Sequence, residues 1–179
     1  ECIDEVFIGE YYLLQSSRDK FPYHEVDSLV FEDSLHTKVK FYVEQYFDSV
    51  ITNVIPQECD LNPEETINNF FFTDRISYYF RNDSLDLTFY ITMSSIRLDS
   101  VKIYDNLLLR MIDRDEISII VDPRTSGKSA SYYTNSQEIL GREFINVFRN
   151  FNYDKYKALM FFNFPCGIVG FRDRSNHTW

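Results

Sequence analysis

The side chains in this sequence best suited to acid–base chemistry are its three histidines, His24, His36 and His177. A Ser-His-Asp triad needs a histidine that is held by a buried acid and directed at a serine. We expect His36 in a hairpin turn and His177 in a polar tail, both exposed to solvent. His24 is then the remaining candidate, and the sequence contains no G-x-S-x-G pattern for a nucleophilic serine.

Two acidic clusters, Asp83 with Asp86 and Asp113 with Asp115 and Glu116, offer the paired carboxylates that glycoside cleavage requires. Both clusters fall in expected turns, where acidic side chains are usually solvated. The tripeptide 127–129 (Gly-Lys-Ser) matches the end of a phosphate-binding loop, but an aspartate stands where the first glycine of that motif is required. The sequence therefore predicts no catalytic residues and favours a protein without enzymatic activity.

The cysteines are Cys2, Cys59 and Cys166. Because an odd number cannot pair completely within one chain, one disulfide with a free thiol and three separate thiols both fit the sequence. None of the spacings provides the close ligand pairs of a zinc site. We therefore expect no metal and no cofactor.

The net charge and the hydrophobic content of the chain exclude some classes of partner and indicate the number of domains. The chain has 179 residues with a formal net charge of −10, which opposes binding to the phosphates of nucleic acids. No stretch reaches the length of about 18 apolar residues that a membrane span needs. At 44% hydrophobic residues the chain can bury a core, so we expect a single domain over residues 1–179, with residues 1–20 as a less regular N-terminal segment.

The main structural signal is an apolar residue at every second position. This period of two predicts antiparallel hairpins rather than helices. The paired segments that we expect are 29–31 with 39–43, 76–80 with 85–93, and 101–111 with 116–121, followed by strands at 144–148, 158–164 and 168–171. A further strand is expected at 46–55, ended by Pro56, and residues 6–14 fit a strand or a short helix.

One helix is expected near residues 62–69. Asn62 can cap it, Pro63 suits its first turn and Glu65 can complete a capping box. Apart from this helix, the sequence predicts an all-β fold, an antiparallel meander of hairpins that forms a sandwich or an open barrel.

Aromatic residues make up 17% of the chain, and adjacent aromatic pairs on strands place one ring outward. Such outward rings can bind glycans or apolar ligands, although packing across neighbouring strands is the alternative role. The residues that we consider as a ligand face are Tyr78, Tyr79, Phe89, Tyr90, Tyr132 and Tyr133.

Two segments add a resemblance to a family. Residues 20–41 (KFPYHEVDSLVFEDSLHTKVKF) resemble the opening of many small Bacteroidetes lipoproteins, and residues 160–179 (MFFNFPCGIVGFRDRSNHTW) resemble their close. The resemblance implies a β-rich domain tethered in the cell envelope, facing the periplasm or the outside. Because Cys2 has only Glu1 before it, we expect any lipid anchor upstream of residue 1.

Three functional hypotheses follow. The first is a non-enzymatic envelope lipoprotein domain that binds a partner, a glycan or an apolar ligand on a sheet face or in a half-barrel. The second is an envelope hydrolase that uses a carboxylate or His24 in a cleft. The third is a structural or assembly protein that acts through an exposed strand edge.

Overall fold

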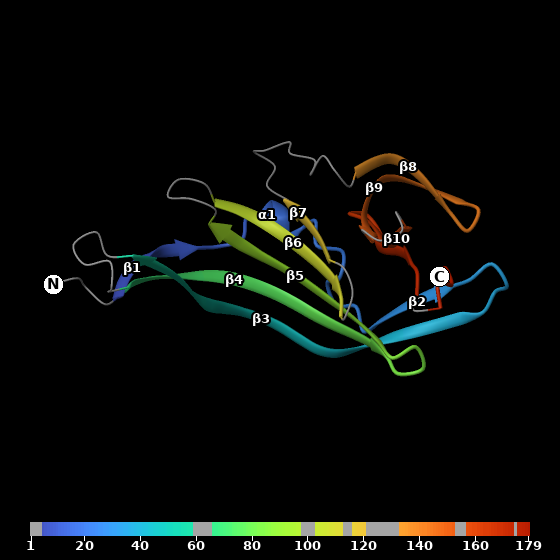
Figure 1. Cartoon of the computed structure of the whole chain (residues 1–179), viewed down its shortest axis with the longest axis horizontal. Helices are drawn as coiled ribbons and strands as arrows, with labels where there is room; N and C mark the ends of the chain where they lie inside the picture. The colour runs from blue at the N-terminus through green and yellow to red at the C-terminus, as the bar shows by residue number, and fades with distance from the viewer. Residues whose placement is uncertain are drawn as a thin grey trace.

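The computed structural model of this chain describes residues 5–58, 66–97, 103–112, 116–120, 133–152, 157–173 and 175–179. These residues form eleven strands and one short helix, arranged as two β-sheets. The predicted all-β class, built mainly from antiparallel hairpins, is confirmed. Figure 1 shows the larger sheet as a long curved layer, with the smaller sheet lying over one end of it.

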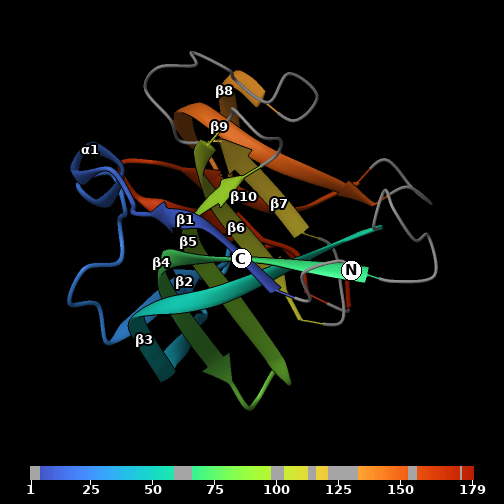
Figure 2. The same cartoon turned by 90° about the vertical axis from the view of Figure 1, so that its left-hand side faces the viewer.

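The larger sheet, sheet A, has seven strands in the order β2-β3-β4-β5-β6-β7, and β1 pairs with β4 off this path. It curls into a half-barrel. The steep change in strand direction from β3 to β7 in Figure 2 follows from the right-handed twist of β-sheets. The strands are β1 (Glu5–Tyr11), β2 (Ser28–Glu32), β3 (Lys38–Glu58), β4 (Thr66–Asn82), β5 (Leu87–Arg97), β6 (Ile103–Met111) and β7 (Glu116–Ile120).

The smaller sheet, sheet B, has four antiparallel strands in the order β11-β10-β9-β8. These strands are β8 (Tyr133–Ile139), β9 (Arg142–Asn152), β10 (Lys157–Asn163) and β11 (Gly167–Phe171). Leu140 and Gly141 join β8 to β9 with φ values of 50° and 77°, the two positive values of a type I′ hairpin turn. The C-terminal residues extend sheet B, because Phe171 and Trp179 exchange backbone hydrogen bonds of 3.0 and 2.9 Å.

The hairpins predicted from the alternating pattern are present. Leu29 lies opposite Phe41 in the β2–β3 pair, and Tyr78 lies opposite Ile91 in the β4–β5 pair. β6 and β7 form the third predicted pair, and β9, β10 and β11 cover the predicted C-terminal strands. The period of two was sufficient here because each hairpin buries one continuous apolar face.

The helix predicted at residues 62–69 is wrong over 66–69, which begin β4, while 62–65 lie outside the described residues. The 66–69 segment pairs with β3, and from Asn68 onward it also pairs with β1. These two ladders of hydrogen bonds outweigh a local capping signal. In the described part of the chain the only helix is α1 (Gln15–Arg18), within the N-terminal segment that was predicted to be less regular.

β3 continues to Glu58, so the predicted end of the strand at Pro56 is wrong. β3 is an edge strand at this point, and an edge strand tolerates proline where the missing N–H would face solvent. β1 is an exception to the antiparallel pattern, because it runs parallel to β4. The chain between β1 and β4 is long enough for the crossover that a parallel pair requires.

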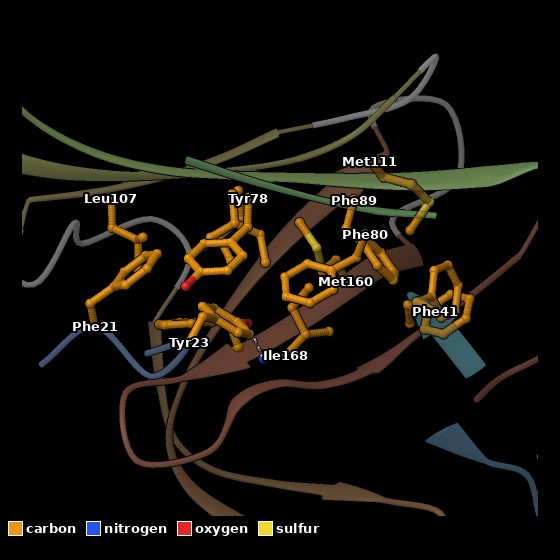
Figure 3. Packing of buried hydrophobic residues seen from close by; sticks show 14 of the residues in the cluster. Phe21, Tyr23, Phe41, Tyr78, Phe80, Phe89, Leu107, Met111, Met160 and Ile168 are labelled. Atoms are coloured by element: carbon orange, nitrogen blue, oxygen red, sulfur yellow. Dashed lines mark hydrogen bonds between the residues drawn. The ribbon is translucent and has the colours of Figure 1, made fainter. Parts of the chain in front are cut away.

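The main core lies between the inner face of sheet A and sheet B. Phe41, Phe89 and Phe171 are each 0% exposed, and their ring centroids lie 4.8 to 5.5 Å apart. Met160 of β10 joins this cluster from sheet B, as Figure 3 shows. Burying one such aromatic side chain stabilises the fold by about 1.5–3 kcal/mol, so this cluster is a main source of cohesion between the sheets.

Residues 12–27 cross the inner face of sheet A and tie it to sheet B. Phe21 and Tyr23 are buried among the aromatic rings of β4. The hydroxyl oxygen of Tyr23 accepts a hydrogen bond of 2.7 Å from the backbone N–H of Ile168, drawn as a dashed line in Figure 3. Burial raises the pKa of Tyr23, which keeps this phenol neutral.

Two carboxylates anchor the start of the crossing segment. Asp105 is buried and accepts hydrogen bonds from the backbone N–H of Leu14 at 2.9 Å and from the hydroxyl of Ser95 at 2.7 Å. Asp74 accepts a longer bond of 3.3 Å from the N–H of Leu13. Since backbone groups crossing a sheet face cannot join its ladders, these side chains supply the acceptors that the segment needs.

Candidate functional site

A cleft of ≈ 570 Å³ opens between the β2–β3 hairpin of sheet A and the β8–β9 hairpin of sheet B. We call it the hairpin cleft. It is lined by residues from the ranges 30–38, 139–144 and 166–169 and by Trp179. Figure 1 shows the two hairpins extending to the same end of the molecule, with the C-terminus between them. Small-molecule sites in proteins commonly have volumes of about 300–1,000 Å³.

The turn of the β2–β3 hairpin is held by Asp33. One carboxylate oxygen of Asp33 accepts the backbone N–H groups of Leu35 and Thr37, both at 2.8 Å. Burial alone would raise the pKa of Asp33, but hydrogen bonds from Thr37, Leu35 and His177 outweigh it and hold the pKa below its ordinary value. The turn is therefore organised around an ionised carboxylate at the edge of the cleft.

The C-terminal tail is folded by a second carboxylate, Asp173. It accepts the backbone N–H groups of Ser175 at 2.9 Å and His177 at 3.0 Å, and the indole N–H of Trp179 at 2.9 Å. Burial opposes ionisation here too, and the hydrogen bonds from Ser175, Trp179 and His177 still lower the pKa of Asp173. These bonds place the Trp179 indole in the wall of the cleft.

The turn and the tail are joined directly, since His177 Nε2 lies 3.1 Å from Asp33 Oδ2. His177 is consequently half-buried, with a side chain 40% exposed, and the prediction of an exposed tail histidine is wrong. His36 is 87% exposed, as predicted for a hairpin turn. The contact joins two segments that lie at opposite ends of the sequence.

One part of the cleft wall is apolar. Ile139, Ile168 and Trp179 are buried there, and Leu140 lies at the rim, 40% exposed. Gly170 allows this close packing, because a Cβ at that position would lie 3.0 Å from both the Ile139 side chain and the Trp179 carbonyl oxygen. The wall therefore offers an aromatic ring and branched aliphatic side chains to a ligand.

The charged side chains of the cleft differ in whether they are already paired. Glu32 Oε2 lies 3.5 Å from Lys38 Nζ, and the other oxygen of Glu32 contacts His36. These contacts, first the hydrogen bond from His36, lower the pKa of Glu32. The guanidinium of Arg142, the first residue of β9, has no hydrogen bond or ion pair within the described ranges. Its guanidinium is thus the cation available to a bound anion.

Cys166 also lines the cleft and is an exposed free thiol. Its backbone N–H donates to Asn163 Oδ1 at 2.9 Å, which fixes the β10–β11 turn. Cys2 and Cys59 lie outside the described residues, so both of the thiol arrangements considered from the sequence stay open.

The members of the predicted ligand face that the structure describes do not line the hairpin cleft. Tyr78 and Phe89 point into the core, where they are 6% and 0% exposed. Tyr79 and Tyr90 lie opposite each other on the outer face of sheet A, half-buried, with ring centroids 4.6 Å apart. This pair has the cross-strand packing that was the alternative role.

The other two members of that set belong to the β8 region. Tyr133 is half-buried, packs edge-on against Phe148 at 5.3 Å between ring centroids, and donates its hydroxyl to Asn146. Tyr132 lies outside the described residues.

The structure also places the candidate catalytic groups. His24 is exposed, and its Nε2 lies 2.7 Å from the carbonyl oxygen of Arg18. Asp83 and Asp86 flank Arg81 in an exposed turn, at 2.6 and 3.6 Å from its guanidinium. The 113–115 turn and the 122–131 loop with its Gly-Lys-Ser motif lie outside the described residues. Neither His24 nor the pair Asp83 and Asp86 lines the hairpin cleft.

The described residues contain no group of three or more His, Cys, Asp or Glu side chains placed to hold a metal ion. They also contain no helix with the length and hydrophobicity of a membrane-spanning segment.

The sequence reasoning did not identify the residues of the hairpin cleft. β8, with the polar sequence YTNSQEI, was not predicted as a strand, and without β8 the turn that presents Arg142 could not be placed. Gly141 before an alternating stretch was the one local signal for that hairpin.

Comparison with protein-family models, with curated proteins and with solved structures gives no match for this chain.

Proposed function

We propose that this protein is a non-enzymatic binding domain whose hairpin cleft holds a small amphipathic anion, an apolar body that carries one carboxylate. The observation that carries the proposal is a cleft of ≈ 570 Å³ whose wall is apolar in part, with Arg142 at its edge and its guanidinium unpaired within the described residues. A guanidinium binds a carboxylate through two parallel hydrogen bonds, and an apolar wall gains free energy by excluding water from the rest of the ligand.

The charge of the cleft favours one anionic group rather than several. Glu32 already pairs with Lys38 and contacts His36, so these two side chains are less available to a ligand. The net charge of −10 also disfavours highly charged anions at long range. A single carboxylate at Arg142 meets both conditions.

Trp179 offers a direct readout, because it is the only tryptophan in the chain and lines the cleft. Decanoate and decanol, which share one apolar chain but differ in charge, are suitable probes for titration by tryptophan fluorescence. We expect saturable binding of both, with decanoate bound more tightly. The Arg142→Gln variant should weaken decanoate binding about tenfold, equivalent to about 1.4 kcal/mol, and leave decanol binding unchanged.

Arg110→Gln provides the matched control, because Arg110 is an exposed arginine on β6 outside the cleft. It should bind both probes like the parent protein. Absence of any saturable fluorescence change, or an equal effect of Arg142→Gln on both probes, would contradict the proposed function.

We also propose that the domain acts in the cell envelope, as the resemblance to small lipoproteins implies. The supporting observation is that the two similar segments, 20–41 and 160–179, pack against each other and together line much of the cleft. Their ring contact between Phe31 and Phe171, 5.0 Å between centroids, belongs to the same region. Fractionation of cells that produce the full-length protein tests this location, and recovery only with the soluble cytosolic fraction would contradict it.

A further inference from the structure

A second feature, separate from the cleft, is the free edge of β3. β2 pairs with β3 only over Lys38–Tyr42, and in the described part of the chain no strand follows on that side of residues 44–58. Large apolar side chains on both faces of this stretch are exposed by 40 to 56%. They are Tyr46, Phe47, Val50, Val54 and Ile55.

Edge strands of natural proteins are usually protected by lysines, prolines or bulges, because their unpaired N–H and C=O groups can pair with another chain. In β3 the bulge between Val43 and Gln45 and the proline at 56 lie at the two ends of the exposed stretch. Between them, at 45–55, the only charged side chain is Asp48, and it is paired with Arg18 at 3.4 Å. The centre of the edge is therefore open to strand addition.

We propose that two copies of this protein associate through β3, which pairs with its twofold-related copy in an antiparallel register centred on Val50. In this register Val50 faces Val50 of the second copy, Tyr46 faces Val54, and Asp48 faces Thr52. These residues alternate along one face of the strand, so the paired strands would bring the apolar side chains of both copies together.

This register also places no two acidic side chains opposite each other. Glu44 would face Pro56, and Asp48 would face a hydroxyl, so no acid lies opposite an acid.

Residues 45–55 would form a ladder about 35 Å long at ~3.3 Å per residue, joining two copies of sheet A into one continuous sheet. The net charge of −10 on each copy opposes association at long range, so dimerisation should strengthen as salt screens that repulsion.

Sedimentation velocity between 1 and 200 µM tests the association. We expect a monomer–dimer equilibrium that shifts toward dimer between 0.05 and 0.5 M NaCl. Val50→Lys places two like charges opposite each other at the twofold and should raise the dissociation constant at least tenfold. Ile145→Lys alters an equally exposed residue, 63% exposed on β9, and should leave the equilibrium unchanged. Thermal unfolding checks that both variants remain folded.

A cross-linking experiment tests the register itself. In a background with Cys2, Cys59 and Cys166 changed to serine, Val50→Cys should form a disulfide-linked dimer on mild oxidation. Ser49→Cys should not, because residue 49 faces residue 51 of the second copy. A protein that stays monomeric at 200 µM in 0.5 M NaCl overturns the proposal, as does a dimer that Val50→Lys leaves intact. Cross-linking that is equal at both positions also overturns it.

Discussion

The hydrogen bond between Tyr23 and Ile168 gives the most direct test of how the two ends of this chain hold each other. Tyr23 is 1% exposed and Ile168 is 7% exposed, so neither group reaches solvent when the bond is lost. Tyr23→Phe removes one oxygen atom and keeps the ring, which stays in contact with Tyr78 and Phe80. The change therefore isolates the effect of leaving the buried N–H of Ile168 without an acceptor.

An unsatisfied buried donor destabilises a fold by about 1–3 kcal/mol. The N–H of Ile168 becomes such a donor when the Tyr23 hydroxyl is removed, so we expect a loss of about 1–3 kcal/mol. In a chain of this length each kcal/mol lowers the melting temperature by about 2–4 °C, so we expect a decrease of about 2–12 °C.

Urea unfolding followed by circular dichroism measures the change in free energy, with the melting temperature as a second readout. Tyr42→Phe is the control, since the Tyr42 ring is 58% exposed on β3 and loss of its hydroxyl should change stability by less than about 0.5 kcal/mol. A Tyr23→Phe protein as stable as the Tyr42→Phe protein would show that the hydroxyl of Tyr23 does not hold the β10–β11 turn.

Three further predictions concern the same region and the core. Gly167→Ala should lower the unfolding free energy by about 2 kcal/mol or more in a urea titration, because Gly167 has a φ of 82° and a Cβ there would lie 2.6 Å from the Tyr23 hydroxyl. The lowered pKa of Asp173 stabilises the fold above the ordinary aspartate pKa of about 3.9, and this contribution is lost as the pH falls through the folded-state value. Asp173→Asn should therefore show a weaker loss of stability between pH 5 and pH 3 than the parent protein, and an equal loss would refute this assignment. Phe89→Ala should destabilise the protein by about 3–5 kcal/mol in the same assay, because the ring is fully buried against Phe41 and Phe171.

The errors in the sequence-based prediction have identifiable physical causes. The segment 66–69 follows a good helix-start signal but forms part of β4, since pairing with β3 and β1 satisfies its backbone on both sides. Pro56 does not end β3, because an edge strand tolerates a proline where the missing N–H would face solvent. In both cases a local signal lost to pairing between segments that are distant in the sequence.

The residues of the candidate site could be predicted from the sequence even less well than the strands. Arg142 and Trp179 carry no motif, and they become neighbours of one cleft only after the β8–β9 turn and the C-terminal tail have folded. The joining contact between His177 and Asp33 spans most of the chain, and no spacing rule predicts it.

The alternation of apolar residues determined by itself that this chain forms antiparallel hairpins, because side chains on a strand point to opposite faces at every second residue. The pairing of segment 29–31 with 39–43 and of 76–80 with 85–93 was predicted from that pattern, and the structure adds the register that places Leu29 opposite Phe41 and Tyr78 opposite Ile91. Only the tertiary structure decided how the hairpins divide into two sheets, where the hairpin cleft opens and which edge of β3 has no partner strand among the described residues. These features depend on buried contacts such as that of Tyr23 with Ile168. Such a contact stabilises the fold only when both segments are buried against each other, and a local sequence pattern does not show this.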